Sequence, residues 1–232
     1  MKPKLLLVAG WAFDAAAMTP LAAELSSGFD VETLAASDSI PVGGPFFLVG
    51  WSLGGMSALE ATLKDPTSVA ALCLISSTAR FCADADSPHG VPPAEIRAMM
   101  LGCKRRPVPT LRKFYERTAA PAVVDPDQAE RLAERLAGGD SEILIDGLEY
   151  LGRADLRRID GQSMPATLIL HGRQDRVISP DAADDLARRI PGSVLRTFDD
   201  VGHDLPLRNP QRVAAEIAEF WKQHAGVTRP RQ

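Results

Sequence analysis

Short, mainly apolar runs alternate with longer stretches of helical spacing along most of the chain. The apolar runs lie at 4–9, 29–34, 46–49, 69–76, 166–170 and 193–198. A run that is apolar at nearly every position, such as 70–75, is typical of a strand buried on both faces of a sheet. The alternation therefore predicts the α/β class, with a mostly parallel sheet and helices on both faces.

The helices of this alternation are predicted at 18–26, 56–63 and 180–189 and at the end of the chain. The last helix has a clear start signal, because Asn209 is a favoured N-cap residue and Pro210 a favoured first residue. Its apolar positions recur at helical spacing, so we expect one buried face. That face carries Val213, Ile217, Phe220 and Trp221.

The alternation stops between Ala79 and Met164, where a mainly helical pattern is interrupted by several prolines. A segment inserted between two sheet strands would lie above the strand ends as a lid. We therefore expect a core formed by 1–79 and 164–225, a helical cap at 80–163 and a flexible tail at 226–232.

Ser52 is the candidate nucleophile, because it lies where an apolar strand meets a helix, within Gly50-Trp51-Ser52-Leu53-Gly54. A serine on such a sharp turn exposes its Oγ above the sheet, and the flanking glycines avoid collisions of a Cβ with the neighbouring elements. The motif alone occurs in many loops. The strand before it and the helix after it favour a catalytic serine over a structural one.

A serine nucleophile needs a base, and His203 is the best placed of the four histidines. It follows the 193–198 strand in a loop, from which an imidazole can reach a nucleophile at the same edge of the sheet. The other three are assigned structural roles. They are His171 at a strand end, His89 in a Pro-His-Gly turn and His224 in the last helix.

The base needs an acid that orients it, and Asp175 follows the 166–170 strand at the position such an acid requires. The competing carboxylates fit less well. Asp199, Asp200 and Asp204 are too close to His203 in sequence to approach its far side easily, and Asp160 precedes the strand. The chain order Ser52, Asp175, His203 is similar to that of α/β-hydrolases.

Acyl transfer also needs hydrogen-bond donors for the developing oxyanion. We assign the backbone N–H of Leu53, directly after the serine, and that of Trp11, in the loop after the first strand. Trp11 also reads as a core aromatic, and the two roles are compatible.

Composition limits the classes of function. With 232 residues and 45% apolar content, the chain supports one sizeable core. The net charge of −4 argues against nucleic-acid binding. Three cysteines without metal-ligand spacing favour a reducing compartment and no bound metal. No stretch is long enough to span a bilayer. The first residues superficially resemble a secretory signal, but its cleavage would remove the first strand, so we expect a cytoplasmic protein without cofactors.

Basic residues gather in one part of the expected cap. Between 104 and 117 the chain carries six lysines and arginines against the single acid Glu116. The cluster is either a solvated helix face or a docking surface for an acidic partner.

Several motifs together resemble the pimeloyl-[acyl-carrier protein] methyl ester esterases of biotin synthesis. The motifs are Gly10-Trp11, Val49-Gly50-Trp51-Ser52-Leu53-Gly54-Gly55, Ser76 to Phe81, Ser87-Pro88-His89-Gly90, Gly147 to Leu151, Asp155-Leu156-Arg157 and Gly202-His203. The resemblance covers most of the chain and implies the α/β-hydrolase fold with an inserted helical cap.

The resemblance also implies site residues and a partner. It implies the triad Ser52, Asp175 and His203, with an oxyanion hole at the amides of Trp11 and Leu53. It further implies a cap whose arginines meet the acidic acyl carrier protein. The counterparts in this chain are Arg112 and Arg117, which flank Phe114 and Tyr115.

Three departures from the family pattern bear on the substrate. Ala9 stands where such hydrolases usually have a histidine, no early hairpin precedes Lys4, and 35–45 is too short for the usual helix and loop. The pocket floor near 37–44 is therefore expected to be more open.

The sequence predicts a serine carboxylesterase that removes the methyl ester from pimeloyl-[acyl-carrier protein]. Three alternatives use the same fold: a generalist esterase for small esters, a menaquinone-pathway lyase and a non-catalytic receptor. The basic cap segment favours the carrier-protein substrate over the generalist.

Overall fold

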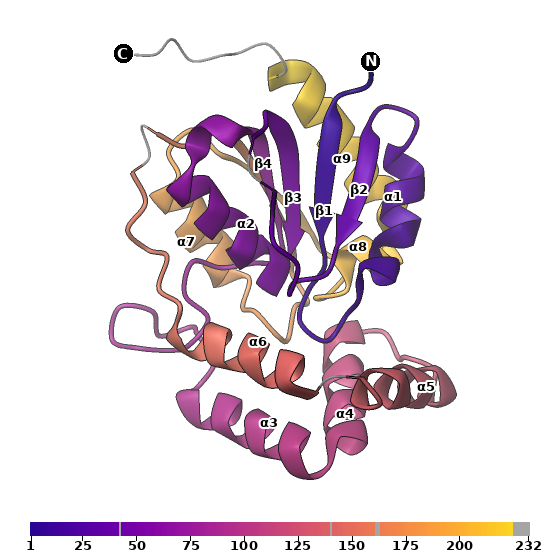
Figure 1. Cartoon of the computed structure of the whole chain (residues 1–232). Coiled ribbons are helices and arrows are strands. Elements are labelled where there is room, and N and C mark those ends of the chain that lie inside the picture. The colour runs from indigo at the N-terminus through magenta and orange to yellow at the C-terminus, as the bar shows by residue number, and fades with distance from the viewer. Residues whose placement is uncertain (42, 140, 161–162, 225–232) are drawn as a thin grey trace.

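A six-stranded parallel sheet forms the centre of the protein (Figure 1). The structure is a computed structural model, and it describes residues 1–41, 43–139, 141–160 and 163–224. The strands are β1 (Lys4–Val8), β2 (Asp30–Leu34), β3 (Phe46–Trp51), β4 (Val69–Ile75), β5 (Ala166–Gly172) and β6 (Val194–Phe198). Their order is β2-β1-β3-β4-β5-β6, and every neighbouring pair is parallel.

Helices cover both faces of the sheet, as the alternation predicts. On one face lie α2 (Leu53–Lys64) and α7 (Asp181–Arg189), and on the other lie α1 (Thr19–Leu25), α8 (Leu205–Arg208) and α9 (Pro210–His224). The short 3-10 helices η1 (Ala15–Met18) and η2 (Pro66–Ser68) precede α1 and β4. Every residue of β3 is buried, because helices pack against both of its sides.

Four helices lie between β4 and β5 in the chain: α3 (Pro93–Arg105), α4 (Pro107–Ala119), α5 (Pro126–Ala137) and α6 (Ser141–Arg153). We call them the helical segment. Figure 1 shows them together at the end of the sheet toward which the strand arrows point. Their apolar faces form a core of their own, which includes Leu111, Leu148 and Leu151. This core continues to Trp11 and Leu53, which belong to the sheet, its loops and the helices that cover its two faces, together called the sheet domain.

The structure refines several boundaries. Helix α9 begins at Pro210 as predicted and buries Val213, Ile217 and Phe220, while Trp221 is only partly buried. Helix α8 was not predicted, because its four residues are too few to show a periodic pattern. The tail predicted at 226–232 lies outside the described residues. Within the described chain, no helix is both long and apolar enough to cross a bilayer.

Candidate active site

Ser52 stands on a strained turn between β3 and α2. Its φ of 57° and ψ of −120° lie in a region that non-glycine residues rarely adopt. The turn is tight enough that a Cβ at Gly50 or Gly54 would approach a backbone carbonyl oxygen to well under 3.0 Å. Ser77 supports the turn by donating a hydrogen bond of 2.9 Å to the carbonyl of Ser52. The predicted glycines are therefore required by sterics.

Ser52, His203 and Asp175 lie together although they are far apart in sequence. The Oγ of Ser52 is 2.9 Å from Nε2 of His203, and Nδ1 of His203 is 2.8 Å from Oδ2 of Asp175. All three residues are buried. An ionised carboxylate can only accept, so Nδ1 carries the hydrogen and Nε2 of the neutral ring accepts from the serine hydroxyl. This tautomer has a lone pair directed at the Ser52 proton.

The carboxylate of Asp175 is held by four donors. Its Oδ1 accepts backbone hydrogen bonds from Val177 at 2.8 Å and Ile178 at 2.9 Å. Burial alone would raise the pKa of Asp175, but the positive charge that His203 carries when protonated, together with hydrogen bonds from His171 and His203, holds that pKa well below its usual range. Asp175 therefore stays ionised over the whole range in which the protein is expected to work.

His171 was assigned a structural role at a strand end, and the structure also places it against the acid. Its Nε2 lies 3.3 Å from Oδ2 of Asp175 and 3.1 Å from the carbonyl of Ile178. The four-residue spacing from Asp175 was the available signal. It was missed because His171 belongs to β5, where alternate residues usually face the core.

The main chain of His203 is fixed as well as its ring. The indole Nε1 of Trp51 donates to the carbonyl of His203 at 2.8 Å, and Trp51 is fully buried. Trp51 precedes Ser52, so one residue of β3 bonds to the main chain of His203 and belongs to the strand that leads to Ser52. Sequence alone could not predict this bond, because it joins residues separated by 152 positions.

The two predicted oxyanion donors flank Ser52. A Cβ built at Gly10 would lie 3.1 Å from the Cβ of Ser52, so the loop after β1 passes directly over the serine. Leu53 begins α2, where the first amides have no partner inside the helix. Within the described residues, neither the Trp11 nor the Leu53 amide donates to another protein group.

The helical segment holds the loop that carries Trp11. The indole Nε1 of Trp11 donates to the carbonyl of Leu144 in α6 at 2.9 Å, and the hydroxyl of Tyr115 in α4 donates to the carbonyl of Ala12 at 2.8 Å. Gly147 is packed so closely that a Cβ there would lie 2.6 Å from the Trp11 ring. Trp11 is therefore both a core aromatic and a loop anchor.

A small apolar cavity adjoins Ser52. Its volume is about 20 Å³, and its walls are Trp11, Phe81, Val91, Glu95, Ile96, Met99, Phe114, Arg117, Leu148, Leu151 and Val177. The predicted binding residues Phe114 and Arg117 thus line the same cavity as Ser52. Tyr115 is buried and bound to Ala12, away from this cavity.

The predicted cap arginines already have acidic neighbours. Arg112 lies 3.7 Å from Glu116 and 3.5 Å from Glu130, and Arg117 forms an ion pair with Glu95. Of the histidines assigned structural roles, His89 lies 3.2 Å from Asp181 and His224 stacks on Phe220.

The described residues include no group of three or more His, Cys, Asp or Glu side chains placed to bind a metal ion. Cys73, Cys82 and Cys103 are buried free thiols. Burial raises the pKa of Cys103 to about 11, so this thiol is protonated near neutral pH.

A parallel sheet with a serine on a strand-to-helix turn, a histidine on a loop and an inserted helical segment is the arrangement of one class of protein, the α/β-hydrolases. The chain belongs to the alpha/beta hydrolase family, whose model matches residues 5–216. The predicted fold is therefore confirmed, and the chain is a hydrolase of this family.

Curated relatives within this family are similar to the chain over most of its length. A pimeloyl-[acyl-carrier protein] methyl ester esterase of Stenotrophomonas maltophilia (strain K279a) is 29% identical over 240 residues, covering 94% of this chain and 92% of the relative. One of the same name from Methylococcus capsulatus is 32% identical over 195 residues, covering 83% of this chain and 76% of the relative. The predicted resemblance is confirmed.

Solved structures show the same fold with different named activities. An esterase from Exiguobacterium antarcticum superposes with a TM-score of 0.84 at 21% identity, covering 95% of this chain and 92% of the esterase. A bromoperoxidase from Bacillus anthracis has a TM-score of 0.84 at 17% identity, covering 96% and 92%. At these identities the likeness establishes the fold alone, so the substrate must be argued from the site.

Proposed function

We propose that this chain hydrolyses the methyl ester of pimeloyl-[acyl-carrier protein] in biotin precursor synthesis, through an acyl-enzyme on Ser52. The observation that carries the chemistry is the continuous contact from Asp175 through His203 to Oγ of Ser52. The names of the relatives support the substrate. The three free cysteines support a cytoplasmic location.

The reaction follows from the geometry in two halves. His203 Nε2 takes the Ser52 proton while Oγ attacks the ester carbonyl, and the amides of Trp11 and Leu53 stabilise the oxyanion. The intermediate collapses, and methoxide leaves as methanol with the proton from His203. Water, deprotonated by His203, then attacks the acyl-enzyme and releases the free carboxylate. Asp175 stabilises the imidazolium in both halves and stays ionised.

The predicted binding residues take different parts in this proposal. Phe114 and Arg117 line the cavity at Ser52, which supports contact with the acyl chain. Tyr115 supports the Trp11 loop from within the protein. Arg112 lies in the basic region proposed to face the acyl carrier protein, although Glu116 and Glu130 already offset part of its charge.

The test is direct. Purified protein is incubated with the methyl ester of pimeloyl-[acyl-carrier protein], and demethylation is followed by the mass of the carrier. We expect rapid conversion that is absent in Ser52→Ala. Short p-nitrophenyl esters are measured in parallel, because they need the same three residues but no carrier protein.

One observation favours a second candidate, a generalist esterase for small esters. The cavity of about 20 Å³ has room for little more than one water molecule as it stands. Good turnover of p-nitrophenyl acetate without any demethylation of the carrier would establish this candidate in place of the first. Absence of both activities would favour the lyase or receptor alternatives.

A further inference from the structure

The cavity at Ser52 is too small for the proposed acyl chain, so part of its wall must open. A water molecule needs a cavity of roughly 10–15 Å³, and this cavity has a volume of about 20 Å³. Two larger hollows adjoin it. One has a volume of about 170 Å³ and the other about 370 Å³. These two hollows are the candidate routes for the acyl chain to Ser52.

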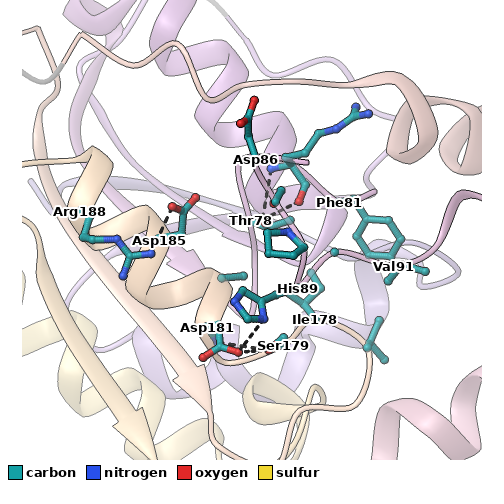
Figure 2. Close-up of a pocket in the computed structure, with 16 residues that line it drawn as sticks. Thr78, Phe81, Asp86, His89, Val91, Ile178, Ser179, Asp181, Asp185 and Arg188 are labelled. Atoms are coloured by element: carbon teal, nitrogen blue, oxygen red, sulfur yellow. Dashed lines mark hydrogen bonds and ion pairs between the residues drawn. The ribbon is translucent and has the colours of Figure 1, made fainter. Parts of the chain in front are cut away.

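The hollow of about 170 Å³ lies between the loop around His89 and α7. Figure 2 shows His89 directed at Asp181, with Phe81 and Val91 on the side away from α7. Phe81, Val91 and Val177 line both this hollow and the cavity at Ser52, so they form the wall between the two. All three are buried, at 6%, 8% and 7% exposure.

Opening that wall would disturb both packing and the acid. Moving the three side chains would expose apolar surface that is now shielded from water. The amide of Val177 also donates to Oδ1 of Asp175, so the same movement would loosen the carboxylate. This route is unfavourable for an enzyme that needs Asp175 fixed.

The larger hollow is a groove between α3 and α4. Glu95, Met99, Phe114 and Arg117 line both the groove and the cavity at Ser52. The polar part of this wall is the Glu95–Arg117 ion pair, whose side chains are 37% and 38% exposed. An exposed ion pair contributes little to stability, and methionine adapts its shape readily. Arg117 also donates to the backbone carbonyl of Arg176 at 2.5 Å, so opening this wall breaks one exposed ion pair and one exposed hydrogen bond.

We propose, building on the proposed function, that the acyl chain reaches Ser52 along the α3–α4 groove by displacing the Glu95–Arg117 pair. At the outer part of the groove, Arg106 and Lys113 receive the phosphodiester of the arm that joins the acyl chain to its carrier. Both line the groove, and neither has an ion-pair partner among the residues that the structure describes. Arg112, by contrast, already has two acidic neighbours.

The route is tested by filling each hollow. Ala98 is exposed and lines the groove, and His89 is exposed and lines the other hollow. Ser52 is labelled with short-chain and long-chain alkyl fluorophosphonates, and the labelling rates are read by mass spectrometry. We expect Ala98→Trp to slow the long-chain probe about tenfold, a loss of the size expected when one well-oriented contact region is blocked. The short-chain probe should slow much less.

His89→Trp is the matched control, and it should leave both rates within about twofold, the range of a surface change. Slowing of the long-chain probe by His89→Trp and not by Ala98→Trp would overturn the route. Thermal unfolding of both variants verifies that they fold. The probes report on the route whatever the natural ester is, so a protein that labels normally but leaves the pimeloyl ester intact would refute the proposed function alone.

The phosphate site is tested with two carrier-free thioesters that compete with the long-chain probe. They are methyl pimeloyl-phosphopantetheine and methyl pimeloyl-pantetheine, which differ by the phosphate. We expect the phosphorylated compound to compete about tenfold better, as charge-assisted contacts allow, and this preference to disappear in the Arg106→Ala/Lys113→Ala variant. Arg112→Ala should retain it. A preference that survives the double substitution, or that is absent in the wild type, would refute the site.

Discussion

The sheet domain and the helical segment hold their residues in place by different means. At the Ser52 turn, backbone approaches backbone so closely that Gly50 and Gly54 tolerate no Cβ. In the helical segment, α3 and α4 are joined at the surface by the exposed Glu95–Arg117 pair, and α4 and α5 by Arg112 and Glu130. The Ser52 turn admits one backbone conformation, whereas these surface ion pairs can open at little cost above the apolar core that the four helices share.

This difference separates chemistry from substrate choice. The reacting atoms need fixed positions, which a buried sheet edge supplies. Under the proposed function, an acyl chain also needs a route to Ser52, which exposed ion pairs between helices can open. The loop with Trp11 belongs to both regions, since it passes over Ser52 and bonds to α4 and α6.

Removing the nucleophile gives the largest expected effect. Ser52→Ala should lower kcat by a factor on the order of 10⁶, the loss found when the serine of such a triad is removed. The unfolding temperature should hardly change. Ser87→Ala is the control and should be fully active, because Ser87 takes no part in the contacts among Ser52, His203 and Asp175. Substantial turnover by Ser52→Ala would assign the nucleophile elsewhere.

The difference in packing between the two regions is tested next by adding a methyl group at a glycine. Gly54→Ala places a Cβ against the carbonyls of Val8 and Ala9. We expect a loss of about 1–3 kcal/mol in the free energy of unfolding, as for overpacked cores, and a large loss of kcat because the Ser52 turn moves. Urea denaturation and ester hydrolysis measure the two.

The control for that change lies in the helical segment. Gly138 follows α5 with a φ of −77°, and the nearest atom to a Cβ there is 3.3 Å away. Gly138→Ala should change stability by no more than about 0.5 kcal/mol, as at ordinary surface positions. Equal losses in both variants would contradict the view that the Ser52 turn is more constrained than the end of α5.

The same contrast explains what the sequence could predict. The Ser52 turn could be predicted because its strand, glycines and helix are contiguous in the sequence. Asp175 and His203 could be predicted because each follows the end of a strand of a parallel sheet. The pairing of Arg117 with Glu95 was not readable, because it depends on how α3 and α4 cross. The bonds from Trp11 to Leu144 and from Trp51 to His203 also join distant segments. The geometry of the Ser52 turn follows from neighbouring residues in the sequence, whereas the packing of the helices depends on contacts between distant residues.

A third change acts where the two regions meet. Trp11→Phe removes the hydrogen bond to Leu144 but keeps an aromatic ring against Phe114, whose centroid is 4.7 Å away. We expect kcat to fall about tenfold with a small change in KM, because one misplaced oxyanion donor costs at most a few kcal/mol.

Trp221→Phe provides the comparison for that change. Trp221 stacks on Phe47 with ring centroids 5.2 Å apart, on the face of the sheet covered by α9. This variant should lose some stability without losing kcat. If both tryptophan variants lost stability and kcat in the same proportion, the link between α6 and the oxyanion loop would be refuted.

The smallest expected effects concern two carboxylates that titrate in opposite senses. Burial raises the pKa of Asp204, which follows His203 in sequence, against the opposing charge of Arg208. Hydrogen bonds from Arg157 lower the pKa of Asp155 to about 2, where the helical segment rejoins the sheet domain. Folding therefore favours protonated Asp204 and ionised Asp155.

The signs of the two pH effects follow. The stabilisation from Asp204 is complete below its unfolded pKa of about 3.9 and is lost as pH rises through the folded value, so Asp204→Asn should gain stability relative to wild type toward neutral pH. The stabilisation from Asp155 is present above about 3.9 and is lost as pH falls toward 2. Asp155→Asn should therefore be less stable at neutral pH and approach wild type in acid.

The Asp155→Asn difference should stay below about 1 kcal/mol, since the Asp155 side chain is 45% exposed and such pairs are screened by solvent. For Asp204, whose side chain is only 8% exposed, the sign of the pH dependence is the test. Urea midpoints measured from about pH 4 to 8 for Asp204→Asn, and from about pH 3 to 6 for Asp155→Asn, cover the ranges in which each group titrates. Slopes of the same sign in the two variants would show that burial does not dominate at Asp204. The base would then lie in a more polar surrounding than its contacts with Trp51 and Asp175 indicate.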